Sequence, residues 1–168
     1  MIVQLTGTLV SKSAPTLVVD VAGVGYEVQA SLSTFDQLPA VGEQFSLLTH
    51  FVVREDAQLL FGFASERERM TFRSLVKISG VGPKLALAIL SGMDVDILSQ
   101  AIRQGDIASL TRLPGVGKKT AERLVIEMKD RIAEWGAAED SGVATTGNAV
   151  DSSSGIVSEA EKALVALG

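Results

Sequence analysis

The 168-residue sequence contains no cysteine and few aromatic residues. Without cysteine, the chain cannot form disulfides, thiolate metal sites, iron–sulfur clusters or a cysteine nucleophile. Phenylalanine, tryptophan and tyrosine together make up 5% of the residues. Stacking of bases on aromatic side chains is therefore not expected to be a main mode of binding. Hydrophobic residues nevertheless make up 46% of the chain, which is enough for a folded core.

The sequence also lacks targeting segments and a nucleotide-binding loop. No basic stretch followed by an apolar run begins the chain, so no signal peptide is expected. No run approaches the roughly 20 apolar residues of a membrane span, and we expect a soluble, cytoplasmic protein. A Walker A loop at Gly117-Lys118 is excluded, because Arg112 replaces its first glycine and Lys119 replaces its serine or threonine. We expect the only histidine, His50, to be structural and the chain to bind no metal or cofactor.

Charge is distributed unevenly along the chain, whose net charge is −5. Residues 1–65 carry a net charge of −4, residues 66–132 carry +4, and residues 133–168 carry −5. A basic middle segment between acidic segments is compatible with a local site for a polyanion, provided that the acidic parts face elsewhere.

The hydrophobic pattern of residues 1–64 is that of a small β domain. About five strand-like runs are rich in β-branched residues, and closing them into a barrel removes exposed sheet edges. An N-terminal five-stranded oligonucleotide-binding (OB-fold) barrel is therefore expected. The polar stretch 54–57 between two apolar runs predicts a hairpin tip, and a short helix is expected at residues 33–38. The expected barrel-core aromatics are Tyr26, Phe51, Phe61 and Phe63.

Helical spacing replaces the strand pattern in residues 65–135, which are predicted to form an all-helical domain. Ser65 is the expected N-cap of its first helix, with Glu68 completing a capping box, and residues 66–69 are expected to be a solvated face. Residues 136–155, rich in glycine, serine and acids, predict a flexible linker. Residues 156–168 regain an amphipathic pattern and are expected to begin a further helical segment that is truncated. The predicted helices cover residues 66–78, 83–91, 94–104, 107–113 and 118–135.

The helical domain contains an internal repeat with an offset of 35 residues. Residues 75–86, LVKISGVGPKLA, align with residues 110–121, LTRLPGVGKKTA. Apolar positions match throughout, Lys77 matches Arg112, and Lys84 matches Lys119. Two Gly-Val-Gly turns between helices predict a tandem helix-hairpin-helix domain.

Each Gly-Val-Gly turn has the features of a phosphate-binding site. Glycine permits a tight turn with positive φ and leaves backbone N–H groups open to a ligand. The following helix directs its unpaired N–H groups and the positive end of its dipole to the same place, and the central valine is expected to anchor the turn in the core. The predicted phosphate-binding residues are Gly80, Val81, Gly82, Lys84, Gly115, Val116, Gly117, Lys118, Lys119 and Arg123.

This region is open to three interpretations other than phosphate-backbone binding. A single Gly-x-Gly is more often an ordinary helix cap, whereas two matching copies favour phosphate binding. A DNA glycosylase or nuclease would need a nucleophile or metal-binding carboxylates, and Asp94 and Asp96 are the close acid pair of the basic segment. A module that binds any duplex is the third alternative. We expect a non-catalytic DNA-binding protein.

On these motifs, the sequence resembles the RuvA family of bacterial Holliday-junction-binding proteins. The resemblance covers residues 1–135 and implies the barrel, the tandem domain and sequence-independent binding of four-way junctions in recombination and repair. It also implies a homotetramer, single or paired, and two protein partners: the RuvB motor ATPase, bound through a C-terminal helical domain, and the RuvC resolvase. The matching segments are 20–26 (DVAGVGY), 49–60 (THFVVREDAQLL), 80–88 (GVGPKLALA) and 114–124 (PGVGKKTAERL).

The resemblance gives the polar hairpin tip a function. Composition alone makes Glu55 and Asp56 ordinary solvated turn residues, but they match the family's acidic pin at the centre of its DNA-binding face. There, their carboxylates would repel phosphates and hold separated strands apart, and Arg54 would steer a strand outward.

Two departures from the family modify these expectations. The family commonly has glycine and basic residues near positions 3–6, where this chain has Val3, Gln4 and Thr6, so a weaker peripheral DNA contact is expected. Residues 156–168 are expected to form only the first helix of the motor-binding domain. We therefore expect impaired coupling to RuvB.

Overall fold

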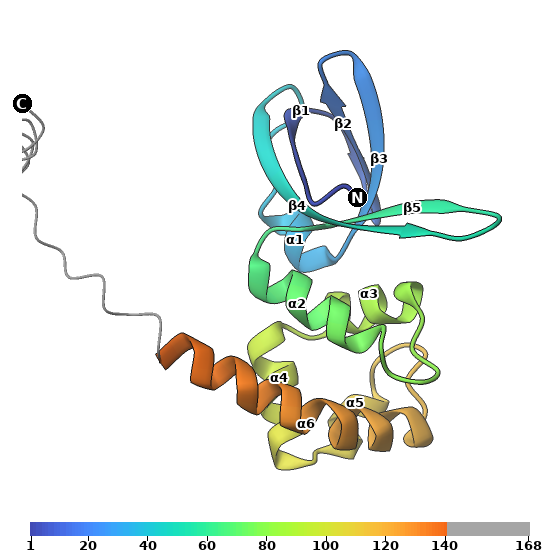
Figure 1. Cartoon of the computed structure of the whole chain (residues 1–168), viewed down its shortest axis with the longest axis vertical. Helices are drawn as coiled ribbons and strands as arrows, with labels where there is room; N and C mark the ends of the chain where they lie inside the picture. Colours follow the sequence, from blue (N-terminus) through green and yellow to red (C-terminus); the bar gives the residue numbers. More distant parts are fainter. Residues whose placement is uncertain (141–168) are drawn as a thin grey trace, which may run out of the picture. The chain divides into compact units, whose positions relative to one another are not determined.

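The structure, a computed structural model, describes residues 1–140 of the chain. Within these residues, a closed barrel with strand order β1-β2-β3-β5-β4 confirms the predicted five-stranded barrel (Figure 1). Neighbouring strands are antiparallel except β3 and β5, whose short parallel pairing closes the barrel. The strands are β1 (Gln4–Ser13), β2 (Thr16–Val21), β3 (Val24–Ala30), β4 (Gln44–Val53) and β5 (Gln58–Phe63).

The barrel interior is filled by residues that alternate along the strands. On β2, Leu17 and Val19 are fully buried, whereas their neighbours along the strand are partly exposed, as the two-residue period of a strand requires. Leu9 and Leu47 belong to the same core cluster. A short helix, α1 (Leu32–Asp36), joins β3 to β4 and confirms the helix expected near residues 33–38.

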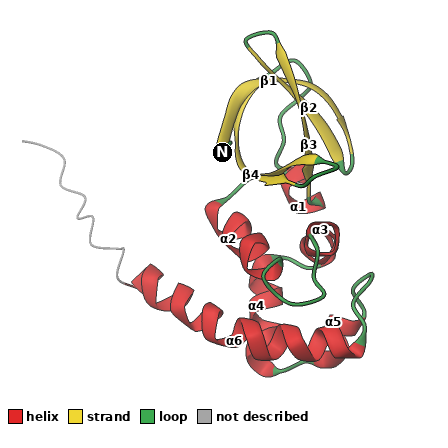
Figure 2. Ribbon diagram, turned by 45° about the vertical axis from the view of Figure 1, so that its right-hand side comes forward, coloured by secondary structure: helices red, strands yellow, loops and turns green. Residues whose placement is uncertain are grey.

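The helical part follows β5 in the sequence, and Figure 2 shows its helices in red and the barrel strands in yellow. Two of its helices begin at aspartates: Asp94 caps α4, and Asp106 caps α5. Hydrogen bonds from the hydroxyl and the backbone N–H of Ser109 lower the pKa of the Asp106 carboxyl. The helices are α2 (Glu66–Leu75), α3 (Pro83–Gly92), α4 (Val95–Gln104), α5 (Ile107–Thr111) and α6 (Lys118–Asp140).

The barrel and the helices form one compact unit, Met1–Trp135. Helix α6 continues to Asp140, into the segment 136–155 that was interpreted as a linker. The rest of that segment, and the predicted start of a motor-binding domain at residues 156–168, lie outside the described residues. Among described residues, no single helix is long and apolar enough to cross a membrane, although α3 and α4, bent by 97°, would qualify together by length and composition.

Aromatic packing joins the barrel to the helices. Phe61 and Phe63 of β5 are fully buried, but they belong to the core cluster of the helices, and the expectation that they fill the barrel was wrong. The ring of Phe72 on α2 lies 5.0 Å from that of Phe61 and 4.9 Å from that of Phe63, measured between centroids. Tyr26 and Phe51 pack, partly buried, against the barrel cluster, as expected.

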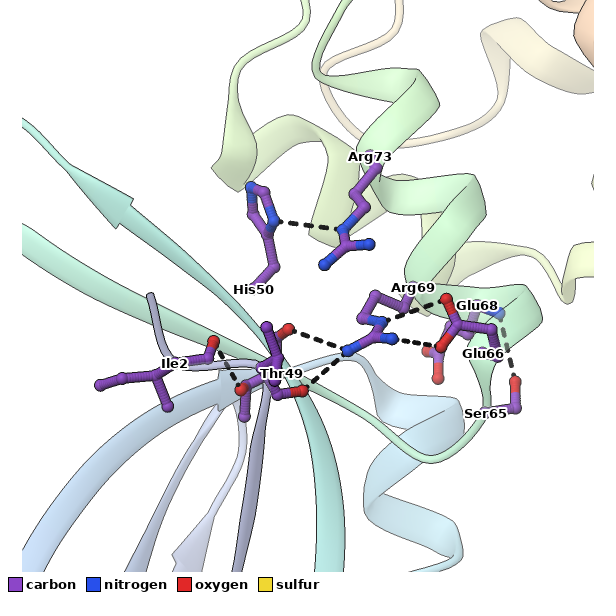
Figure 3. Close-up of polar contacts among 9 residues, drawn as sticks. Ile2, Thr49, His50, Ser65, Glu66, Glu68, Arg69 and Arg73 are labelled. Atoms are coloured by element: carbon purple, nitrogen blue, oxygen red, sulfur yellow. Dashed lines mark hydrogen bonds and ion pairs between the residues drawn. The ribbon is translucent and has the colours of Figure 1, made fainter.

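The first turn of α2 is not the solvated face that its charge pattern predicts. Ser65 accepts a hydrogen bond from the Glu68 N–H at 3.2 Å, which confirms half of the capping box. The Glu68 carboxylate is turned toward α1 and is buried. The Arg69 guanidinium donates to the carbonyl of Thr49 and pairs with Glu66 (Figure 3). Periodicity identified the helix correctly but not which charged residues the barrel covers.

His50 has the structural environment that was expected for it. Its ring packs edge-on against Phe72 at 5.6 Å, and its Nδ1 accepts a hydrogen bond from Arg73 Nε at 3.4 Å. Partial burial lowers the pKa of His50, and the charges of Arg73 and Arg69 lower it further. The neutral imidazole is therefore a packing group between β4 and α2.

Truncation of Phe72 should destabilise the whole compact unit. We expect Phe72→Ala to reduce the free energy of unfolding by about 3–5 kcal/mol, because it removes a fully buried ring and leaves a cavity. Denaturant titration followed by circular dichroism measures the loss. Met70→Ala, on the same helix at a side chain 37% exposed, is the control and should cost much less. Equal losses for the two variants would contradict a shared aromatic core.

Candidate nucleic-acid interface

The two Gly-Val-Gly turns have the same backbone geometry. The first glycine of each has positive φ, +90° at Gly80 and +78° at Gly115, a conformation that other residues adopt only with strain. Each central valine is buried, and its N–H donates to the carbonyl three residues earlier, at 3.0 Å for Val81 and 3.1 Å for Val116. The predicted repeat is therefore present as two equivalent hairpins.

The second glycine of each turn is not explained by backbone strain, unlike the first. Gly82 has φ −84° and ψ 170°, which any residue can adopt. A Cβ atom built on Gly82 or on Gly117 would meet no atom of the protein within 4 Å. Neither strain nor packing within the chain excludes a side chain at these positions. Because both glycines stand where a helix begins, the open space is compatible with close approach of an anion to the backbone.

Gly82 is also the N-cap of α3, and no side chain caps it. Pro83 occupies the first turn, where its missing N–H costs nothing. The remaining first-turn N–H groups and the positive end of the helix dipole face the same open position. The predicted lysines Lys84, Lys118 and Lys119 are exposed, and none of them takes part in a salt bridge within the described residues.

The two hairpins are braced against each other. One guanidinium nitrogen of Arg123, on α6, donates to the carbonyl of Ser79 at 2.9 Å, beside the first turn. In return, Leu85 of α3 lies where it would be 3.0 Å from a Cβ on Gly115. Arg123 was predicted only as a phosphate ligand, and its bracing contact was missed. The internal repeat contained one indication of this role: the position equivalent to Arg123 in the first copy is Ala88, so the arginine is not a shared feature of the two hairpins.

The residues of the expected acidic pin stand at the tip of the β4–β5 hairpin. The strands pair as far as Val53 and Gln58, and the Arg54 N–H donates to the Ala57 carbonyl at 2.8 Å. Arg54, Glu55 and Asp56 are all exposed. In Figure 1 this hairpin extends away from the body of the barrel.

The pin hairpin lies beside the first Gly-Val-Gly turn close to its tip. A cavity of about 190 Å³ is lined by Arg54, Leu59, Gly82, Pro83 and Lys84. The structure thus brings together two predicted cations, Arg54 and Lys84, which are 30 positions apart in the sequence. Their side chains line this cavity together with the apolar residues Leu59 and Pro83, next to the open backbone of Gly82.

The acids that a nuclease interpretation would need have other partners. The Asp94 carboxylate accepts a hydrogen bond from the Asp96 N–H at 2.9 Å as the cap of α4. The Asp96 carboxylate pairs with Arg67 at 2.6 Å. Within residues 1–140, no group of three or more histidine, aspartate or glutamate side chains is placed to hold a metal ion.

Comparison with known protein families identifies both parts of the chain. Residues 1–62 match the family described as the RuvA N terminal domain. Residues 72–130 match the family described as the SAM-like helix-hairpin-helix tandem. The two matches cover the barrel and both Gly-Val-Gly turns.

Similar proteins are found along the full chain. A protein of Nitrosococcus oceani is 55% identical over 170 residues, which cover 100% of this chain and 84% of the relative. A protein of Thioalkalivibrio sulfidiphilus is 55% identical over 168 residues with the same coverage. A protein of Idiomarina loihiensis is 61% identical over 135 residues, 80% of this chain and 66% of the relative. Each is named Holliday junction branch migration complex subunit RuvA.

The second glycines provide a direct test of the interface. We expect Gly82→Ala and Gly117→Ala to change the free energy of unfolding by less than about 1 kcal/mol, because the methyl group meets nothing and the restriction of the unfolded chain by alanine is opposed by its poorer helix-capping ability. DNA affinity should fall by about tenfold, because the methyl group separates the backbone N–H groups from a phosphate. Thermal unfolding and fluorescence anisotropy measure the two effects.

Gly25→Ala is the matched control for these variants. Its Cβ would make only an ordinary contact with Val18, at 3.7 Å, on the barrel. This variant should bind DNA like the unmodified chain. Unchanged DNA binding by Gly82→Ala and Gly117→Ala would show that the turns are only helix connections.

Proposed function

This chain belongs to the RuvA family, and we propose on that basis that it binds four-way (Holliday) junction DNA through the phosphate backbone, without reading the base sequence. The observation that carries the proposal is the pair of equivalent hairpins, each with an open second glycine and adjacent exposed lysines. Backbone N–H groups and ammonium groups recognise phosphates and carry no base code. Gly80, Val81, Gly82, Gly115, Val116 and Gly117 supply the backbone sites, and Lys84, Lys118, Lys119 and Arg123 supply charge.

We also propose that the chain acts as a non-catalytic subunit of a branch-migration complex. Four copies around the centre of a junction would place one pair of hairpins on each arm and four acidic pins at the crossover. RuvB would supply the ATP-driven motor, and RuvC is a proposed further partner at the open face of the tetramer. The curated relatives' names, which place them in a branch migration complex, support this assignment.

The proposed function is tested by comparing a four-way junction with linear duplex of equal length. We expect tighter binding to the junction, little effect of scrambling the arm sequences, and a fall of log K with log salt concentration of about 0.9 per phosphate neutralised. Native mass spectrometry should show four chains per junction or a multiple of four. Equal affinity for both DNAs would indicate a general duplex-binding module, and strand cleavage in Mg²⁺ would indicate a nuclease.

The acidic pin is proposed to act by repulsion. Neutralising it with Glu55→Gln and Asp56→Asn preserves side-chain size, and should strengthen duplex binding by about tenfold because phosphates could then approach the pin. The preference for junctions should fall accordingly. Lys118→Ala is the contrasting variant and should weaken binding to both DNAs alike. Weaker junction binding by the neutralised pin, or unchanged duplex binding, would contradict a repulsive role.

A further inference from the structure

A buried carboxylate that the proposed DNA contacts do not use lies between the barrel and the helices. Glu68 on α2 is 4% exposed, and among buried residues of the described chain it is the only charged one. Removing a carboxylate from water is costly unless hydrogen bonds replace its hydration. The positions of its partners are therefore closely constrained.

The carboxylate of Glu68 joins three elements of the fold. Its Oε1 accepts from the hydroxyls of Ser31 and of Ser33, the latter at 3.1 Å, where α1 begins. Its Oε2 accepts from the Thr34 hydroxyl at 2.6 Å and from the Ala64 N–H at 3.3 Å. Ala64 is the first residue after β5, the returning strand of the pin hairpin. Helix α2 thereby holds the end of β5 and the start of α1.

The next residue of α2 holds the other strand of the pin hairpin. Arg69 donates to the carbonyl of Val3 at 2.7 Å and to that of Thr49, on β4, at 3.4 Å. Thr49 lies opposite Gly62 of β5 in the sheet register. In Figure 3, Arg69 reaches from α2 toward Thr49, while the Ser65 cap fixes the start of the same helix. Both strands are thus attached to α2 at the base of the hairpin.

The same cluster is hydrogen-bonded to the end of α3 that lies away from the first phosphate-binding turn. The N–H of Leu32, in α1, donates to the hydroxyl of Ser91 on α3 at 3.2 Å. Helix α3 begins at Pro83, directly after the open Gly82. The bonded path therefore runs from β5 through Glu68 and α1 to α3.

We propose that Glu68 is a positioning residue that fixes the acidic pin relative to the first Gly-Val-Gly turn and so sets the preference for junctions over duplex; this inference rests on the proposed function. From Thr49 to Glu55 the extended strand spans about 20 Å. A tilt of about 10° at the base would move the pin tip by about 3 Å, the length of a hydrogen bond. Val52 and Leu59, close to the tip, also pack against the helical core, and the hydrogen bonds of Glu68 add to this packing in fixing the position of the pin.

The first experiment measures the position of the pin without DNA. Since the chain has no cysteine, Val53→Cys and Ile126→Cys provide two unique label sites, 62% and 72% exposed. Spin labels there, in chains diluted with unlabelled protein, report the distance between pin and α6 by dipolar spectroscopy. We expect Glu68→Gln, whose amide nitrogen cannot accept the donated hydrogens, to broaden or shift this distance distribution. Thr34→Val, which removes one hydroxyl at constant shape, should do the same.

The second experiment measures junction and duplex affinities of the same variants. We expect the ratio of the two affinities to fall by about tenfold, while the salt dependence of duplex binding stays unchanged, because no phosphate contact is removed. Glu27→Gln, the same substitution at an exposed barrel residue, is the matched control and should alter neither readout. All comparisons are made well below the unfolding temperature of each variant, so that lost stability does not enter the ratio.

The two readouts separate this inference from the proposed function. An unmodified chain that binds junction and duplex equally would refute the proposed function, and with it the selectivity part of the inference, while the label distances would still test whether Glu68 holds the pin. Unchanged distances and an unchanged affinity ratio in both Glu68→Gln and Thr34→Val would overturn the positioning role. Altered distances with an unchanged ratio would show that Glu68 fixes the pin but that pin position does not set selectivity.

Discussion

The packing of Phe72 against Phe61 and Phe63 is the contact on which the arrangement of both candidate binding elements depends. Phe61 and Phe63 belong to β5, which returns from the acidic pin, and Phe72 belongs to the helix that leads to the first Gly-Val-Gly turn. A barrel and a set of helices with separate cores would be free to move on their connection. Here one cluster extends from β5 into α6, so the pin and the hairpins share a single rigid support.

The two glycines of each turn illustrate how internal and external constraints can be told apart. Gly80 and Gly115 are explained by the chain itself, since their positive φ is required to reverse direction between helices. Gly82 and Gly117 have no such explanation, because their backbone is unstrained and the space beside them is empty. Gly25 is also not required by the fold, but Gly82 and Gly117 in addition stand where a helix begins and unpaired backbone N–H groups attract anions. Gly82 and Gly117 are therefore the candidate points of contact with phosphate.

The strands and hairpins could be predicted from patterns of neighbouring residues. The contacts between residues far apart in the sequence could not. Alternating apolar residues identified the barrel strands, and the matched Gly-Val-Gly frames identified both hairpins, because each signal is contained in neighbouring residues. The brace from Arg123 to Ser79 spans 44 positions, and the bond from Ser31 to Glu68 spans 37. Nothing in the sequence of residues 66–69, Glu-Arg-Glu-Arg, shows that Glu68 is buried and Glu66 is exposed. The difference arises because α1, which is distant in the sequence, packs against Glu68 and not against Glu66.

The same distinction explains how a chain of net charge −5 can present a cationic surface. Within the basic segment, Asp94 and Asp106 cap helices, and Asp96 pairs with Arg67. Glu66 pairs with Arg69, and Glu68 is enclosed by hydroxyl groups. Within the part of the chain that the structure describes, Lys84, Lys118 and Lys119 have no such partners, and they face solvent. Five acids of the basic segment are thus engaged by the fold, while these three lysines stand beside the open turns, and this arrangement favours a positive local potential there.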